Sequence, residues 1–124
     1  RVVSVIDRYL EHARIFSFHH GGSPLLFISS ADWMTRNLDK RVELMIPIED
    51  KNCRKRLQTI LDAAFKDNCN AHEILENGSS QRIIKKKGQK KFRMQEHLQN
   101  NAQKSAKAQA HQRTTTFEPH TPAE

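Results

Sequence analysis

Polar residues that could bind a phosphoryl group stand next to apolar segments near the start of this chain. His12 and Arg14 would share one face of a strand, because residues two apart on a strand point the same way. A guanidinium can hold two phosphate oxygens with its fixed fork, and an imidazole can donate a hydrogen bond or transfer a proton. The pair therefore indicates phosphate contact with proton transfer.

Two further polar groups follow the next apolar segments. Ser29-Ser30-Ala31-Asp32 closes an apolar run, where hydroxyl and backbone N–H groups can orient phosphate oxygens. Glu43 follows, and a carboxylate there could hold a histidine in one tautomer. Phosphoryl transfer depends mainly on positioning and charge stabilisation, which these residue types supply. The residues alone predict a phosphate site and nothing more specific.

Each of these signals also has a simpler structural explanation. His12 could be an ordinary strand histidine, and Arg14 with Glu43 could form a cross-strand ion pair of little energetic weight. The Ser and Asp residues at 29–32 could cap the turn that follows them, which is compatible with phosphate orientation as well. At the level of single residues these alternatives stay open.

Other residue types that bind metals lack the spacing of a metal site. His19 and His20 are neighbours in a predicted loop tip, and Cys53, Cys69 and His72 do not have the four-ligand spacing of a zinc site. The two cysteines fall at opposite ends of one predicted helix, too far apart for a disulfide, so we expect free thiols. We predict no metal ligand in this chain.

The elements that must position these residues begin with a β-hairpin. Residues 12–18 and 25–29 have strand-like composition, and the Gly- and Pro-containing turn between them joins two strands. Residues 40–47 are predicted as a third strand. Residues 30–37, between the second and third strands, are expected to be irregular and anchored by Trp33 and Met34.

A helix is predicted to follow the strands. Its apolar residues recur at helical spacing over residues 51–67, and Glu49-Asp50 can cap its start. Residues 71–75 are expected to end a second helix or to pack beneath it. The fold class is therefore α/β or α+β, with a small mixed sheet and packed helices.

The net charge of +7 lies in the last part of the chain. Residues 1–77 hold 11 Lys/Arg and 11 Asp/Glu, while residues 78–124 hold 10 Lys/Arg and 3 Asp/Glu. Residues 81–93 contain seven basic residues and no acidic one, with Ile83-Ile84 as a candidate short strand. A basic surface attracts polyphosphate, nucleic acid and acidic membranes alike. A solvated face explains the run equally well.

The length allows one small domain, which we place at residues 1–98. Residues 99–124 have few large apolar side chains, so burial cannot offset the entropy of ordering them, and we expect a disordered tail or a frayed helix. No run approaches the roughly 20 apolar residues of a membrane span. The chain starts at Arg1 without an initiator Met, so we expect a piece of a longer protein.

The polar pattern is similar to the second half-motif of the phospholipase D superfamily. That motif usually reads His-x-Lys, then Gly-Ser-x-Asn and a later Glu. Here Arg14, Ser29 and Asp32 stand where Lys, Gly and Asn are expected. These departures argue against an ordinary phosphodiesterase. They match polyphosphate kinases, whose C-terminal domains resemble phospholipase D in fold.

The resemblance to polyphosphate kinases rests on Leu-Glu-His-x-Arg at residues 10–14 and Ser-Ser-Ala-Asp-Trp-Met-x-Arg-Asn at residues 29–37. It covers roughly residues 1–98, and continues at Arg41-Val42-Glu43, Pro47, Gly88, Lys91, Arg93 and Gln95. It implies half of a phospholipase D-like unit within the C-terminal domain of the enzyme.

The resemblance also implies an activity. Polyphosphate kinases reversibly transfer the terminal phosphate of ATP to inorganic polyphosphate through a phosphohistidine, whose nucleophilic His lies in a preceding domain. His12 would then be the second active-site His, and Glu43 would orient the nucleophile. The site residues implied are catalytic His12 and Glu43, with ATP-phosphate contacts from His12, Arg14, Ser30 and Asp32.

The same resemblance implies Mg²⁺ as cofactor, bound mainly by residues outside this chain. The implied partners are ATP/ADP, inorganic polyphosphate and the remaining domains, in a cytoplasmic homo-oligomer with peripheral membrane association. The isolated chain should be inactive. Two alternatives are a phospholipase D-superfamily phosphodiesterase and a basic polyanion- or nucleic-acid-binding module. Phe92 stands alone among the lysines, which disfavours nucleic acid.

Overall fold

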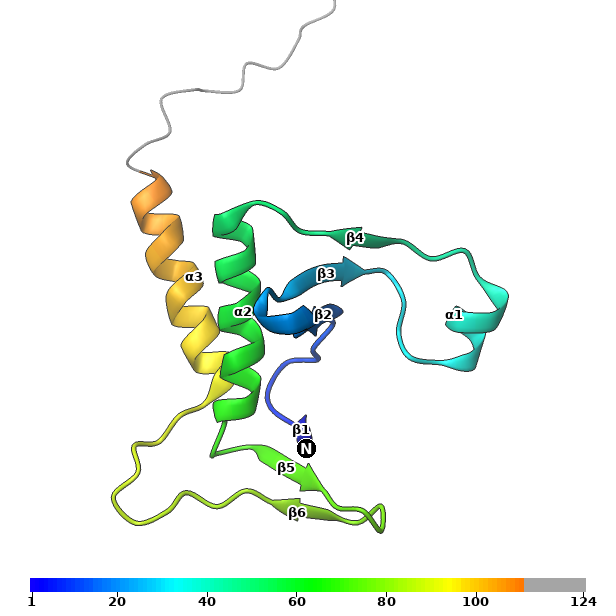
Figure 1. Cartoon of the computed structure of the whole chain (residues 1–124). Coiled ribbons are helices and arrows are strands. Elements are labelled where there is room, and N and C mark those ends of the chain that lie inside the picture. The colour runs from blue at the N-terminus through cyan, green and yellow to red at the C-terminus, as the bar shows by residue number, and fades with distance from the viewer. Residues whose placement is uncertain (111–124) are drawn as a thin grey trace, which may run out of the picture.

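Two small antiparallel sheets and three α-helices form the described part of the computed structural model, which covers residues 1–110 (Figure 1). One sheet has the order β1–β5–β6 and the other the order β2–β3–β4. The expected α+β class is confirmed. The strands form two separate antiparallel sheets, however, and not the single mixed sheet that we predicted.

The predicted β-hairpin is confirmed. Strands β2 (Ile15–Phe18) and β3 (Leu25–Ser29) pair antiparallel, with Ile15 opposite Ile28. The turn between them contains a short 3₁₀ helix, η1 (His20–Gly22), and Gly22 has a φ of 97°, which favours glycine. His19 and His20 are exposed there, as expected for a loop tip.

The third strand is shorter than predicted. Strand β4 (Met45–Pro47) pairs with β3, whereas residues 41–44 are irregular. Val42 is 99% exposed, so the alternating apolar side chains of this segment have no surface in the described structure against which a longer strand could pack. The pairing ends where β3 ends, at Ser29 opposite Met45.

A helix occupies part of the segment that we predicted to be irregular. Helix α1 (Thr35–Lys40) buries Asn37, while Trp33 is 81% exposed and stacks on Phe16 with 6.1 Å between ring centroids. Trp33 is therefore not the anchor that we expected. The buried amide of Asn37 takes that place.

Helix α2 (Lys51–Lys66) agrees with the prediction to within one residue. The Asp50 side chain caps its start by accepting a hydrogen bond of 2.8 Å from the Cys53 N–H. This bond lowers the pKa of Asp50, because the carboxylate is the better acceptor. Ala63 is buried on the inner face of the helix. Cys53 is exposed, Cys69 is half-buried, and both thiols are free.

The prediction for residues 71–75 is wrong, because this segment is a strand. Strand β5 (Ala71–Ile74) lies between β1 (Val2–Val5) and β6 (Ser80–Arg82) and pairs antiparallel with both. Ala71 is fully buried where the three strands meet. The candidate strand at Ile83-Ile84 is also displaced, since β6 ends at Arg82 and Ile84 is 80% exposed.

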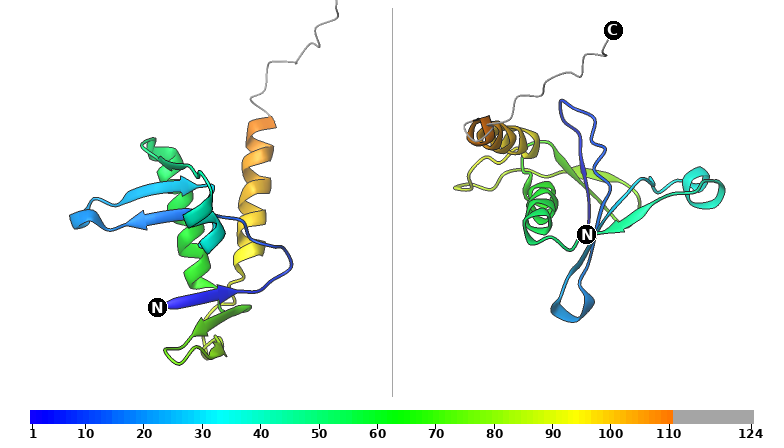
Figure 2. Two further views of the ribbon diagram at one scale, coloured as in Figure 1. Left: turned by 90° about the vertical axis from the view of Figure 1, so that its right-hand side faces the viewer. Right: turned by 90° about the horizontal axis from the view of Figure 1, so that it is seen from above.

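Helix α3 (Met94–Ala110) lies beside α2 in both views of Figure 2. Met94 and Gln95 are buried at its start, and Ala, Gln and Lys are good helix formers along its length. The expected tail therefore begins inside a helix. Residues 111–124 of that tail lie outside the described residues. None of the helices within residues 1–110 is long and apolar enough to cross a membrane.

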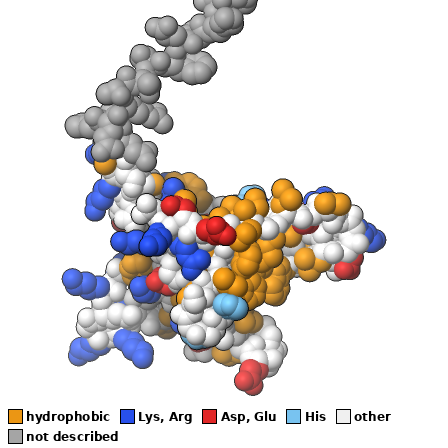
Figure 3. All heavy atoms as spheres, turned by 45° about the horizontal axis from the view of Figure 1, so that its top comes forward, with side chains coloured by type: hydrophobic (Ala, Val, Ile, Leu, Met, Phe, Trp, Pro, Cys, Tyr) orange, Lys and Arg blue, Asp and Glu red, His pale blue; other side chains and the backbone are white. Residues whose placement is uncertain are grey.

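The surface divides into an apolar and a basic part. Figure 3 shows hydrophobic side chains gathered across the middle of the molecule, where the β2–β3–β4 sheet lies, and Lys and Arg side chains mainly at one side. The exposed apolar side chains include Phe18, Leu25, Ile28, Met45 and Ile46 from the three strands. This sheet carries the candidate site at its end.

Candidate active site

Arg14 and Asp32 form a two-pronged ion pair at the open end of the β2–β3 hairpin. Arg14 Nε donates to Asp32 Oδ1 at 2.6 Å, and Nη2 donates to Oδ2 at 3.2 Å. The hydrogen bonds from Arg14 lower the pKa of the Asp32 carboxyl, and the same bonds raise the pKa of the guanidinium. The charges of His12 and Arg36 lower the pKa of Asp32 further.

Ser30 links Glu43 to the end of β3. Its hydroxyl donates a short hydrogen bond to Glu43 Oε2 and accepts one of 3.0 Å from the Leu44 N–H. The backbone N–H of Ser30 donates to the Leu44 carbonyl at 3.0 Å. The single hydroxyl proton of Ser30 is therefore used to position Glu43. Glu43 belongs to the same cluster, because its partner Ser30 lies two residues before Asp32, the partner of Arg14, and its charge raises the pKa of Arg14.

Ser29 stabilises the turn beneath this cluster. Its hydroxyl donates to the Leu44 carbonyl at 2.9 Å and accepts from the Ala31 N–H at 3.0 Å. These contacts are of the kind expected if the serines serve the turn. They also bring the segment that carries Glu43 to the end of β3, so turn formation and site assembly use the same hydrogen bonds.

Asn37 supports Asp32 from below. Its Nδ2 donates to the Asp32 carbonyl at 3.2 Å, and the Met34 N–H donates to that carbonyl at 2.8 Å. Asn37 therefore hydrogen-bonds the loop under the site. Asn37 Oδ1 is buried and has no hydrogen-bond partner among the described residues.

The structure corrects two geometric expectations for the site. Arg14 pairs with Asp32, so the alternative of a cross-strand ion pair between Arg14 and Glu43 is wrong. His12 and Arg14 also precede β2, which begins at Ile15, so they are not two apart on a strand. Arg14 is nevertheless tied to the sheet, because its carbonyl accepts a 3.0 Å hydrogen bond from the Ser29 N–H.

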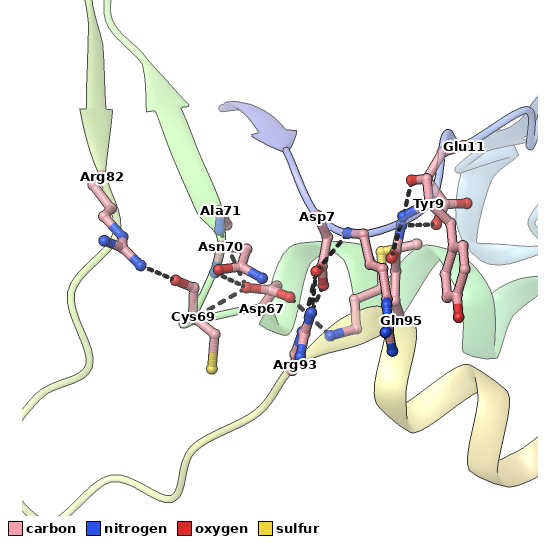
Figure 4. A network of polar contacts seen from close by, with 12 residues as sticks. Asp7, Tyr9, Glu11, Asp67, Cys69, Asn70, Ala71, Arg82, Arg93 and Gln95 are labelled. Carbon is pink, nitrogen blue, oxygen red and sulfur yellow. Dashed lines mark hydrogen bonds and ion pairs between the residues drawn. The ribbon is translucent and has the colours of Figure 1, made fainter.

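A second network, not predicted from the sequence, holds the segment that leads to His12 (Figure 4). Arg93 donates to both carboxylate oxygens of Asp7, whose side chain is only 2% exposed. The hydrogen bonds from Arg93 hold the pKa of Asp7 well below its usual range. Gln95 donates to the Tyr9 carbonyl at 2.6 Å and accepts from the Tyr9 N–H at 2.9 Å. Residues 7–11 are thereby fixed to the start of α3.

Asp67 is the central acceptor of the network. Its side chain is buried, and its two oxygens accept hydrogen bonds from four backbone N–H groups, those of Cys69, Asn70, Ala71 and Met94. An Asp just after a helix suggests a local turn. No sequence signal connects it to Met94, which lies 27 residues further along.

The cluster could bind and orient a phosphoryl group. His12 is exposed, and Arg14 keeps one nitrogen, Nη1, with no hydrogen-bond partner in the described residues. Within residues 1–110, no group of three His, Cys, Asp or Glu side chains is placed to hold a metal ion. The Asp32 and Glu43 carboxylates already accept hydrogen bonds from Arg14 and Ser30.

Similarity to known proteins identifies the family. Residues 1–95 match the family model described as polyphosphate kinase C-terminal domain 2. The chain belongs to the polyphosphate kinase family. The prediction of a C-terminal polyphosphate kinase fragment is confirmed.

Polyphosphate kinases from several bacteria show the extent of the similarity. The polyphosphate kinase of Rhodopirellula baltica is 50% identical over 121 residues, which are 98% of this chain and 14% of that protein. That of Exiguobacterium sibiricum is 42% identical over 107 residues, 86% of this chain and 15% of that protein. The crystal structure of polyphosphate kinase from Porphyromonas gingivalis matches with a TM-score of 0.78 and 35% identity, covering 87% of this chain and 16% of that one.

The chain thus spans only a small part, 14–16%, of these polyphosphate kinases. Its fold and family follow from the similarity. The activity of the whole protein does not follow from so short a segment.

Proposed function

We propose that the protein carrying this chain is a polyphosphate kinase that reversibly transfers the terminal phosphate of ATP to inorganic polyphosphate. The observation that supports this most is the family match over residues 1–95, which includes the whole Arg14–Asp32–Ser30–Glu43 cluster. In this proposal the chain completes an active site whose remaining residues lie elsewhere in the protein.

The proposal assigns roles to three side chains, of which His12 is exposed and Arg14 and Glu43 are half-buried. His12 contacts the phosphates of the nucleotide and handles a proton, for which its ring is suited near neutral pH. Arg14 stabilises charge on the transferred phosphoryl group. Glu43 orients the nucleophilic His of another domain, which carries the phosphate as a phosphohistidine. Mg²⁺ would be bound mainly by residues outside this chain.

Ser30 and Asp32 are proposed to act chiefly on their neighbours. Ser30 holds Glu43 and Asp32 holds Arg14 in the unliganded cluster. Direct phosphate contact by Ser30 remains a prediction. For this contact, the Ser30 hydroxyl would have to donate its hydrogen bond to a phosphate oxygen in place of Glu43. Asp32, as a carboxylate, would contact phosphate only through a shared donor such as Arg14.

The proposed partners are ATP/ADP, inorganic polyphosphate and the other domains of the same protein. We also propose a cytoplasmic homo-oligomer with peripheral membrane association. The oligomer can be tested by light scattering on the full-length protein, and the membrane association by co-sedimentation with anionic vesicles.

The decisive experiment compares ATP-dependent polyphosphate synthesis by the full-length protein with that of His12→Ala. We expect a loss of several orders of magnitude, because phosphate contact and proton transfer would both disappear. His19→Ala is the matched control, since His19 is exposed in the hairpin turn.

Each outcome separates the possibilities. Synthesis that is unaffected by His12→Ala would leave the kinase activity standing and make His12 a structural residue. No synthesis by correctly folded full-length protein would reject the kinase, and ATP-independent hydrolysis of a phosphodiester would then favour the phosphodiesterase alternative.

A further inference from the structure

A basic hollow of about 420 Å³ lies between the β5–β6 hairpin and the segment that leads into α3. Four of its lining residues are basic, namely Arg82, Lys85, Lys91 and Arg93, and the others belong to residues 68–70. No acidic side chain lines it. The hollow therefore concentrates positive charge at one concave place.

Most of this charge is not compensated. Arg93 pairs with Asp7, but Arg82 donates to the Cys69 carbonyl at 2.8 Å and Lys85 donates to the Gln89 carbonyl at 3.0 Å, both neutral acceptors. Among the described residues, no carboxylate forms an ion pair with Arg82, Lys85 or Lys91. Such cations attract anions more strongly than neutralised ones do.

The walls of the hollow are held in place by hydrogen bonds. Asn68 donates from Nδ2 to the Lys90 carbonyl at 3.0 Å and accepts from the Phe92 N–H at 2.8 Å. Asp67 fixes the backbone of residues 69–71. Because the backbone is already ordered, a bound anion would not have to offset the entropy of assembling the walls.

The hollow is separate from the Arg14 cluster. It lies in the part of the molecule formed by β5, β6 and the segment after β6, whereas the Arg14 cluster lies at the end of the β2–β3–β4 sheet toward α1 (Figure 1). Figure 4 shows Arg82 and Arg93 on either side of the Cys69 backbone. The two places share no residue.

The chemistry of the lining favours an inorganic phosphate chain over nucleic acid. Single-stranded nucleic acid is bound by basic grooves that also offer aromatic rings to the bases. No aromatic side chain lines the hollow, and the nearby Phe92 ring lies against His97, with 4.9 Å between ring centroids. The guanidinium and ammonium groups of the lining can donate hydrogen bonds to the phosphate oxygens of such a chain.

We propose that this basic hollow is a second binding site for inorganic polyphosphate, which holds a distant part of a long chain while its end is at the Arg14 cluster. This inference rests on the proposed kinase function for its biological meaning. The binding of polyphosphate to the hollow does not depend on the kinase function. A site of this kind makes affinity depend on chain length, because only a long chain can occupy both places.

The test uses Lys85→Gln/Lys91→Gln in the full-length protein and long-chain inorganic polyphosphate as the probe, without ATP. We expect the affinity to fall about tenfold and the slope of log affinity against log salt to decrease by about two, one for each lost phosphate contact. Lys104→Gln/Lys107→Gln on α3 removes the same charge from exposed positions outside the hollow and should change neither quantity.

A charge-preserving variant guards against misfolding. Lys85→Arg/Lys91→Arg should bind polyphosphate like the wild type, and tripolyphosphate binding should be little affected by any variant. Equal losses in the two Gln pairs, or no loss in either, would overturn the proposal. Tighter binding of a single-stranded oligonucleotide than of polyphosphate at equal salt, lost in Lys85→Gln/Lys91→Gln, would overturn it in favour of nucleic acid.

Turnover distinguishes this proposal from the kinase function. If the wild type makes polyphosphate and Lys85→Gln/Lys91→Gln binds polyphosphate as the wild type does, only the second site is rejected. If the wild type makes none but binds polyphosphate through Lys85 and Lys91, the kinase function fails and the binding site stands.

Discussion

At the scale of single residues, the charged groups of the candidate site are held by their neighbours before any ligand is present. Arg14 donates from Nε and Nη2 to the Asp32 carboxylate, and the Ser30 hydroxyl donates to one carboxylate oxygen of Glu43. A phosphoryl group would therefore meet Arg14 through Nη1 or would compete with Asp32. Such preorganisation reduces the rearrangement needed when charge develops during transfer.

The Asp7–Arg93 pair gives a prediction about pH. The pKa of Asp7 lies below its ordinary value of 3.8 in the folded chain, so the unfolded chain binds more protons at acid pH. The stabilisation is full above the ordinary pKa and is lost as the pH falls through the lower, folded-state pKa. Asp7→Asn should therefore destabilise the chain at pH 7 and do so less at acid pH.

The measurement is the free energy of unfolding by urea as a function of pH, for the wild type and Asp7→Asn. Asp62→Asn, at an exposed position on α2, is the control and should show little effect at any pH. A penalty for Asp7→Asn that stays constant down to the lowest pH would contradict the assignment to the Asp7 carboxylate.

At the scale of elements, one side chain joins three of them. Asp67 lies directly after α2 and accepts hydrogen bonds from the backbone N–H groups of the first residue of β5 and the first residue of α3. Arg93 and Gln95, beside this junction, hold residues 7–11, which lead to His12. The start of α3 is therefore coupled to the position of a proposed catalytic residue through the backbone.

Asp67→Ala tests this junction. It would leave four backbone N–H groups without their acceptor in a buried place, so we expect the free energy of unfolding to fall by about 3 kcal/mol or more. Asp62→Ala should change it by no more than about 0.5 kcal/mol. Denaturant unfolding of the chain provides both values, and equal effects of the two variants would refute the central role of Asp67.

At the scale of the whole molecule, the irregular segments on either side of α1, next to the β2–β3–β4 sheet, leave an apolar surface uncovered. Trp33, Val42 and Leu44 are all more than half exposed. Relatives are several times longer than this chain, which covers 14% of the Rhodopirellula baltica protein. We expect another part of the full-length protein to cover this surface.

The fluorescence of Trp33 can test whether this surface is covered, because Trp33 is the single tryptophan of this chain. Its fluorescence in the isolated chain should be that of a water-exposed indole, quenched readily by acrylamide. In full-length protein with other tryptophans replaced by Phe, the emission should shift to shorter wavelength and quenching should decrease. Trp33→Phe gives the background signal. Equal quenching in both proteins would show that the surface stays open.

Local patterns in the sequence predicted the parts of the fold that depend on neighbouring residues. The turn at residues 21–24 predicted the hairpin, and apolar spacing with Asp50 as cap predicted α2 to within one residue. The residues of the Arg14 cluster were named from their motif, but their pairing was not. The choice of Asp32 over Glu43 as partner of Arg14 depends on how the loop folds over Asn37.

The family and the class of fold were thus determined by the sequence, because a turn, a helix cap and a motif each depend on residues close together along the chain. Tertiary structure decided that residues 71–74 are a strand, that Asp7 meets Arg93, and that Gln95 fixes Tyr9. These contacts join residues as much as 86 positions apart. Neither partner carries a local signal of the other, since each gains its stabilisation only when the packed chain removes both from water.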